Sequence, residues 1–130
     1  MNAVSLRAGL VVLLVAAVAG CGVTIGGAPI LVSPPNGHTF ACAAPGQAYL
    51  FTWGGVPNVI NYILHIEANA APYPIVFNAT IAAPTTTLAV TDAQLPYCGD
   101  TFRWRVGATF TSSPTAWSGY WTFTILPAPP

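Results

Sequence analysis

The sequence predicts an all-β fold in which two sheets pack into a sandwich. From residue 28 onward, no stretch free of proline and glycine shows helical periodicity. Residues 61–67 instead alternate, with Tyr62, Leu64 and Ile66 on the side expected to face a core. Similar short runs recur along the chain, each bounded by Pro, Gly or Ser, and this spacing is typical of a sandwich. We therefore expect short antiparallel strands in two layers.

Seven runs of the chain have strand character. Residues 28–32 form the first, because the prolines and Asn36-Gly37 that follow fit an edge strand running into a turn. Residues 49–53 form the second and residues 61–67 the third. The remaining strands are expected at residues 75–80, 85–90, 101–109 and 120–126. The tail at 127–130 is rich in proline, which cannot continue a ladder.

Residues 1–20 have the organisation of a signal peptide. The amino terminus and Arg7 supply a positive region, and residues 10–19 supply an apolar run that is shorter than the roughly 20 residues needed to span a bilayer. The following Val18-Ala19-Gly20-Cys21 resembles the lipobox of bacterial lipoproteins. The resemblance implies cleavage before Cys21 and lipidation of its thiol, with further acylation making a stable anchor. An ordinary secretory signal, with Cys21 as a free or paired thiol, is the alternative.

The lipobox resemblance also implies a location. Residues 21–28 would hold the lipidated cysteine and a short linker, so the protein would be attached to a membrane of the cell envelope through Cys21. In Gram-negative families the absence of aspartate after the cysteine, here Gly22, goes with export to the outer membrane. Lipidation also leaves an even pair among the three cysteines, Cys42 and Cys98, which an oxidising compartment allows to bridge.

The mature chain carries few charges. It has no lysine, and it contains two arginines and three acidic residues, which gives a formal net charge of −1. Nucleic acid and anionic lipid headgroups are therefore poor partners, because phosphates require a basic patch. A surface with so little charge is prone to association, which leaves self-association or burial in an assembly open.

Several short pieces follow one another in a fixed order within residues 29–126: Pro29-Ile30-Leu31-Val32-Ser33-Pro34 with Asn36-Gly37, Phe51-Thr52-Trp53, Tyr62-Ile63-Leu64, Phe102-Arg103-Trp104-Arg105-Val106-Gly107-Ala108, Trp117-Ser118 and Trp121-Thr122-Phe123-Thr124-Ile125. In this order they resemble a fibronectin type III domain of the kind found in bacterial surface and secreted proteins. The resemblance implies a seven-stranded antiparallel β-sandwich of fibronectin type III or immunoglobulin-like type. The core is then expected to contain Trp53, Tyr62, Leu64, Trp104, Val106, Trp121, Phe123 and Ile125.

The chain departs from this family at one point. The family has a tyrosine near the start of its sixth strand, and Phe102 stands there without a hydroxyl. The family topology places Cys42 and Cys98 at the same pole, so a disulfide there would take over the role of the missing tyrosine. It places the amino terminus at the opposite pole, beside residues 54–58, 82–84 and 110–119, which would face the membrane.

Few residues are candidates for chemistry. His65 and Glu67 share a strand face, but two ligands are too few for a metal site, and His38 is expected in a distant loop. The expected role of Glu67 is pairing with Arg103 or Arg105 on a solvated face. No base lies at recognisable spacing from the loop serines Ser112, Ser113 and Ser118. We therefore expect no catalytic residue, no metal, no cofactor and no enzymatic activity.

Two aromatic residues, Trp117 and Tyr120, are the candidates for contact with a partner, since the other tryptophans alternate into the core. The pattern Asn78-Ala79-Thr80 matches a glycosylation site, but such matches are usually incidental in bacteria. The sequence thus predicts a non-catalytic, lipid-anchored envelope module that mediates protein binding or adhesion. A structural subunit of a larger envelope assembly and a carbohydrate-recognition module are the alternatives, so the expected partner is an envelope protein or a glycan.

Overall fold

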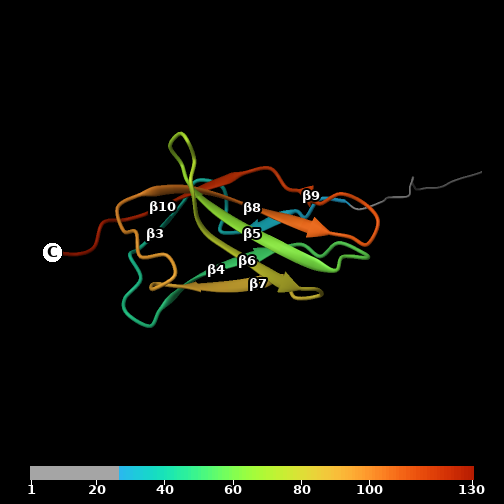
Figure 1. Ribbon diagram of the computed structural model, residues 1–130. Coiled ribbons are helices and arrows are strands. Elements are labelled where there is room, and N and C mark those ends of the chain that lie inside the picture. The colour runs from blue at the N-terminus through green and yellow to red at the C-terminus, as the bar shows by residue number, and fades with distance from the viewer. Residues whose placement is uncertain (1–26) are drawn as a thin grey trace, which may run out of the picture.

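The computed structural model describes residues 27–130 and shows an all-β domain built from two packed sheets (Figure 1). The predicted signal peptide, the lipobox and Cys21 lie outside the described residues. Within the described part the chain forms strands and turns and no helix, as the sequence predicts. No helix of that part is long and apolar enough to cross a membrane.

The smaller sheet has three antiparallel strands in the order β2-β4-β7. These are β2 (Leu31–Ser33), β4 (Ala48–Trp53) and β7 (Thr87–Thr91). Strand β4 occupies the centre, and its residues Tyr49, Phe51 and Trp53 point into the core while the intervening residues face outward. The bounds of each of the three strands lie within three residues of the predicted ones.

The larger sheet has six strands, five of which follow the order β3-β10-β8-β5-β6. They are β3 (His38–Phe40), β10 (Trp121–Ile125), β8 (Thr101–Thr109), β5 (Asn61–Ala68) and β6 (Ile75–Ala82), with β9 (Ala116–Trp117) pairing with β8. The described residues therefore form nine strands, where seven were expected.

The two additional strands are short and correct the sequence prediction. His38 was expected in a loop, but it begins β3, which pairs in parallel with β10. The chain crosses from the smaller sheet to the larger one between β2 and β3. Just before β3, the Gly37 N–H donates to the Thr122 carbonyl of β10. Similarly, Ala116–Trp117 were expected in a loop but pair with β8 as β9.

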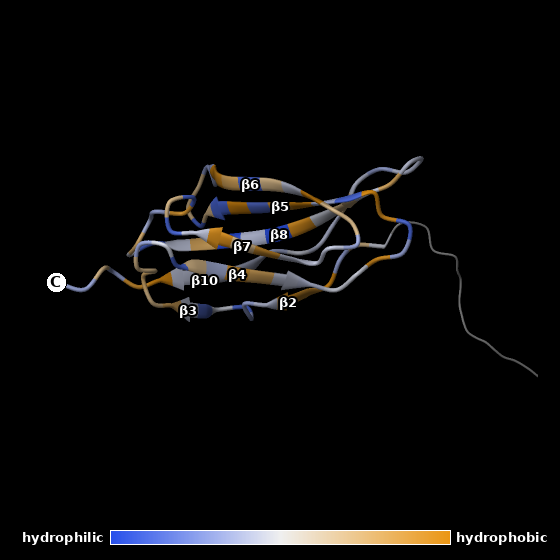
Figure 2. Ribbon diagram, turned by 90° about the horizontal axis from the view of Figure 1, so that it is seen from below, coloured by the Kyte–Doolittle hydropathy of each residue, from blue (hydrophilic) through white to orange (hydrophobic). Residues whose placement is uncertain are grey.

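The core lies between the sheets and follows the predicted alternation, which Figure 2 shows along β5 and β8. Seven of the eight predicted core residues are at most 1% exposed: Trp53, Tyr62, Leu64, Trp104, Val106, Phe123 and Ile125. The eighth, Trp121, is only partly buried and packs edge-on against Trp104. Strand β3 pairs with β10 only from Phe123 to Ile125, so β3 does not extend along β10 as far as Trp121.

The two ends of the described chain, residues 27 and 130, lie at opposite poles of the sandwich (Figure 1). We call the end that holds residues 27–30, 54–60, 83–86 and 110–115 the amino-terminal pole. The other end, which holds the Cys42–Cys98 disulfide and the tail after Ile125, is the carboxyl-terminal pole. Strand β5 runs from the first pole to the second and β8 runs back, so side chains on their shared outer face form ordered pairs.

Candidate functional site

The chemically richest surface is the outer face of the larger sheet, where β5 and β8 lie side by side. Cross-strand register places Glu67 opposite Arg103 and His65 opposite Arg105. These positions alternate with buried core residues, so all four side chains project from the same outer face. The sequence predicted this arrangement of acids and bases, and the structure confirms it.

The two arginines are stacked between aromatic rings. The guanidinium of Arg105 lies 4.1 Å from the Trp117 ring centroid and 4.8 Å from that of Tyr120. The guanidinium of Arg103 lies 3.8 Å from the Tyr120 centroid and 3.9 Å from that of Tyr73. Aromatic and cationic groups therefore alternate in one continuous series, Trp117–Arg105–Tyr120–Arg103–Tyr73, which we call the aromatic–arginine stack.

Glu67 fixes one side of this stack. Its Oε1 accepts from Arg103 Nε at 2.8 Å and lies 2.8 Å from Arg103 Nη2, while its Oε2 accepts the Tyr120 hydroxyl at 2.8 Å. The expected pairing with Arg103 is thus confirmed, but the expected solvated face is wrong, because Glu67 is only 5% exposed. The partners that cover it come from β8 and from the residue just before β10.

The surroundings of the stack shift the pKa values of three groups. Burial would raise the pKa of Glu67, but hydrogen bonds from Tyr120 and Arg103 and the charges of both arginines outweigh it, so the pKa lies below its usual value. Burial and the bond to Glu67 raise the pKa of the Tyr120 hydroxyl, which stays a donor. Burial and the charge of Arg105 lower the pKa of His65, against a smaller opposite influence of Glu67.

Backbone geometry determines where Trp117 lies. Strand β9 pairs Trp117 with Gly107, and the Ser118 hydroxyl accepts the Val106 N–H at 3.0 Å while the Ser118 N–H donates to the Val106 carbonyl at 2.9 Å. The indole then lies over Gly107, where a side chain would leave no room. His65 contacts the same indole, with ring centroids 4.6 Å apart.

Tyr73 is the member of the stack that sequence reasoning missed. It lies in the turn between β5 and β6 and has a φ of 58°, which is uncommon for a residue with a large side chain. It is also 41% exposed, whereas the predicted contact residues Trp117 and Tyr120 are half-buried. A turn of this kind carries no periodic signal, so only the fold brings Tyr73 to Arg103.

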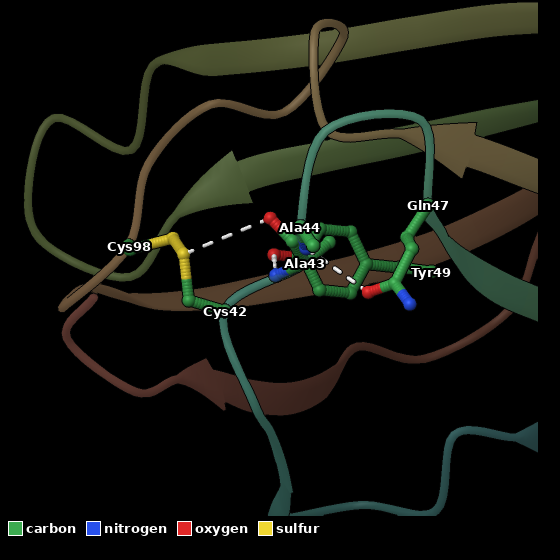
Figure 3. The surroundings of a disulfide bond; sticks show 6 residues. All are labelled: Cys42, Ala43, Ala44, Gln47, Tyr49 and Cys98. Carbon is green, nitrogen blue, oxygen red and sulfur yellow. Dashed lines mark hydrogen bonds between the residues drawn. A yellow bond between two sulfur atoms is a disulfide. The ribbon is translucent and has the colours of Figure 1, made fainter. Parts of the chain in front are cut away.

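The carboxyl-terminal pole is held by the predicted disulfide (Figure 3). Cys42 and Cys98 have Cα atoms 5.5 Å apart and are separated by 56 residues. Beside them the buried Tyr49 hydroxyl accepts the Ala43 N–H at 2.8 Å. A tyrosine–backbone bond therefore exists at this pole, supplied by β4 rather than by the position of Phe102. Tyr62 makes the same six-residue connection at the other pole, where its hydroxyl accepts the Val56 N–H at 2.9 Å.

The remaining candidate residues are not gathered into a reactive site. His38 and His65 lie on strands separated by β10 and β8, so the structure does not bring them together. In residues 27–130 no group of three or more His, Cys, Asp or Glu side chains could hold a metal ion. The hydroxyl of Ser118 accepts the Val106 N–H of β8 and donates to the Gly119 carbonyl. What this face offers is a fixed array of aromatic and cationic groups suited to non-covalent contact.

Comparison with known proteins adds no family assignment. No protein-family model matches the chain, and no curated protein is significantly similar to it. The lipoprotein and fibronectin type III resemblances therefore stay predictions from the sequence. The role of the aromatic–arginine stack is accordingly inferred from its own geometry.

Proposed function

We propose that this protein is a lipid-anchored bacterial envelope module of fibronectin type III type that binds a protein partner through the aromatic–arginine stack. Trp, Tyr and Arg are the residues most enriched in the energetically dominant parts of protein interfaces. All three types are gathered here on one sheet face, and their geometry is fixed before any partner arrives. Preorganised side chains lose little conformational freedom on binding, which favours affinity. No catalytic step is part of the proposal.

The sheet arrangement supports the fibronectin type III part of this proposal. In a constant-type immunoglobulin domain the fourth strand joins the sheet of the first two. Here β6, which follows β5, pairs with β5 in the larger sheet instead. The three-stranded sheet then contains only β2, β4 and β7. Strands β3 and β9 are short additions to the seven that the resemblance implies.

Two tyrosines of equal exposure provide the test of partner binding. Tyr73 in the stack and Tyr97 at the carboxyl-terminal pole are each 41% exposed. The lipidated protein and its Tyr73→Ala and Tyr97→Ala variants are used to capture envelope proteins, which are quantified by mass spectrometry. The proposal predicts a partner that Tyr73→Ala loses and Tyr97→Ala keeps. Equal capture by both variants would show that the stack is not the binding surface.

One observation favours the assembly alternative. Strand β6 is an edge of the larger sheet, eight residues long, and contains neither a charged residue nor proline. Natural edge strands usually carry charges, proline or bulges that prevent pairing with another chain. Strand β6 has one such irregularity, at Val76, where its register with β5 shifts. The uncharged part from Phe77 to Ala82 pairs without interruption and is therefore suited to sheet extension by a second copy.

The carbohydrate alternative has less support from the geometry. Sugar binding by stacking requires a free aromatic face, whereas the Trp117 ring already contacts Arg105, His65 and Gly107. Loss of glycan binding without loss of stability in Trp117→Ala would nevertheless establish it. Within the stack, Tyr73 is more exposed than Trp117 and Tyr120 and is the better placed ring for such a contact.

A further inference from the structure

We propose that the amino-terminal pole is a membrane-contact surface, in which the apolar loop 54–60 rests in the headgroup and acyl boundary of the bilayer. This inference rests on the lipid anchor proposed above and adds a second, non-covalent attachment to it. The expected occupant is an electrically neutral lipid surface. Charge distribution, exposed apolar groups, backbone hydrogen bonding and the position of the chain end all support this choice.

The charges of the domain avoid this pole. Residues 27–30, 54–60, 83–86 and 110–115 contain no Asp, Glu, Lys or Arg. Asp92 and Asp100 lie in loops at the opposite pole, and Glu67 and Arg103 lie at the ends of β5 and β8 nearest to that pole. The amino-terminal pole therefore has no charged group whose desolvation would oppose contact with lipid.

Apolar side chains are exposed at the same pole. Ile30 is 75% exposed and Ile60 is 48% exposed. Beside Ile30 the surface forms a hollow of about 260 Å³ with a mainly apolar lining, made by Gly27, Ala28, Ile30 and residues 54–57. Exposed apolar surface of this kind marks an interaction site more often than an ordinary solvent face.

Three backbone N–H groups of the loop are hydrogen-bonded within the protein. The Gly54 N–H donates to the Ile30 carbonyl at 2.7 Å, and the Ile60 N–H donates to the Thr109 carbonyl at 2.8 Å. The Val56 N–H donates to the Tyr62 hydroxyl at 2.9 Å. A backbone group without a partner is costly in a medium that lacks water, so these bonds suit a loop that enters lipid.

The chain end brings this pole to the bilayer. Cys21 precedes Gly27 by six residues, and Gly27 lines the apolar hollow. Whatever its conformation, a stretch of six residues spans at most roughly 22 Å. A lipid on Cys21 would therefore hold the domain close to the membrane surface with its uncharged pole nearest.

Depth-dependent fluorescence quenching tests the inference. Ile60 and Ile75 are 48% and 50% exposed, but Ile75 begins β6 at the opposite pole. The lipidated full-length product with Ile60→Cys or Ile75→Cys is labelled with an NBD fluorophore and reconstituted in phosphatidylcholine vesicles containing doxyl-labelled lipid. We expect at least twofold stronger quenching at position 60 than at position 75. Equal quenching at both positions would overturn the inference, and Pro57→Cys supplies a second probe of the same loop.

The intact mass of the same samples shows whether Cys21 carries lipid. This measurement distinguishes failure of the membrane contact from failure of the lipid anchor. A lipidated protein without selective quenching at position 60 would refute membrane contact by this pole and leave the anchor standing. A mature protein without lipid would refute the anchor. In that case the same variants, with Cys21→Ser added so that only the introduced thiol is labelled, are mixed with preformed vesicles, where selective quenching at position 60 would still support the apolar contact and its absence would refute it.

Discussion

Gly107 and Trp117 face each other across β8 and β9 so closely that a Cβ on Gly107 would lie 2.9 Å from the indole ring. The close approach lets the indole pack directly against β8, where the Arg105 guanidinium lies 4.1 Å from its ring centroid. The aromatic–arginine stack therefore depends on the absence of a side chain at one position of β8.

The first prediction concerns Gly107→Ala. The added methyl group displaces Trp117 from β8, and we expect the free energy of unfolding to fall by about 1–3 kcal/mol, as for other overpacked sites. Urea denaturation monitored by circular dichroism measures the change. Gly119→Ala is the matched control, since nothing lies within 4 Å of a Cβ at that position. Equal stability of both variants would show that the indole moves freely.

The second prediction concerns the carboxylate of Glu67. In Glu67→Gln the charge that holds Arg103 and Tyr120 is lost, and we expect the free energy of unfolding to decrease by about 1–3 kcal/mol. Asp100→Asn is the control, because this exposed acid makes no side-chain hydrogen bond within the described residues. Urea denaturation at pH 7 checks both, and a loss below 0.5 kcal/mol for Glu67→Gln would contradict the account.

The third prediction is a pH dependence caused by His65. Its pKa is lowered in the folded protein by burial and by Arg105, so the unfolded chain binds more protons as the pH falls below about 6.5. Above that pH the neutral imidazole does not oppose folding. As the pH falls from about 6.5 through the lowered pKa of the folded protein, the free energy of unfolding decreases. The corresponding loss for Glu67, whose pKa is also lowered, begins only below about pH 4.3.

Urea midpoints at pH 7.5 and 5.5 measure the contribution of His65. We expect a smaller decrease between these pH values in His65→Gln than in the wild-type protein. His38→Gln is the control, because His38 lies on β3 at the far edge of the sheet. The same decrease in the wild type and in His65→Gln would exclude His65 as the titrating group.

The fourth prediction concerns the disulfide. Cys42 and Cys98 close a loop of 56 residues, and the chain-entropy model gives a stabilisation of about 4 kcal/mol. The double variant Cys42→Ser/Cys98→Ser should therefore melt well below the parent protein under non-reducing conditions. Calorimetry with and without reductant measures this. Reductant should lower the melting temperature of the parent only, and equal melting temperatures for both oxidised proteins would contradict the prediction.

The fifth prediction concerns the edge strand β6. A lysine in place of Asn78 or Thr80, both of which are exposed, should reduce any self-association in mild detergent, because a charged edge opposes strand pairing. Light scattering of the wild type and the variants measures the oligomeric state. Unchanged oligomers in both lysine variants would exclude β6 as the site of assembly.

Most of the fold could be predicted because long strands carry a periodic signal. The alternation in 61–67 and 101–109 correctly located β5 and β8 and most of the core. Strands β3 and β9 were missed because two or three residues are too few to show a period. They form because one side of β10, and the part of β8 that β10 does not reach, are free for pairing.

The candidate site was predictable only in part. Spacing along β5 and β8 placed Glu67 and Arg103 on one face, which the structure confirms. Burial of Glu67 was not foreseen, since Tyr120 reaches it from a position 53 residues away in the sequence. Tyr73 joins the stack from a turn, and turn residues carry no pattern that indicates a distant contact.

Intact-mass spectrometry of the membrane-extracted protein, with and without reduction and alkylation, tests the central claim most directly. The account predicts a chain that begins at Cys21 and carries diacylglyceryl and acyl additions, with Cys42 and Cys98 alkylated only after reduction. A soluble chain without lipid, with Cys21 open to alkylation or removed, would contradict the proposal of a lipid-anchored envelope module.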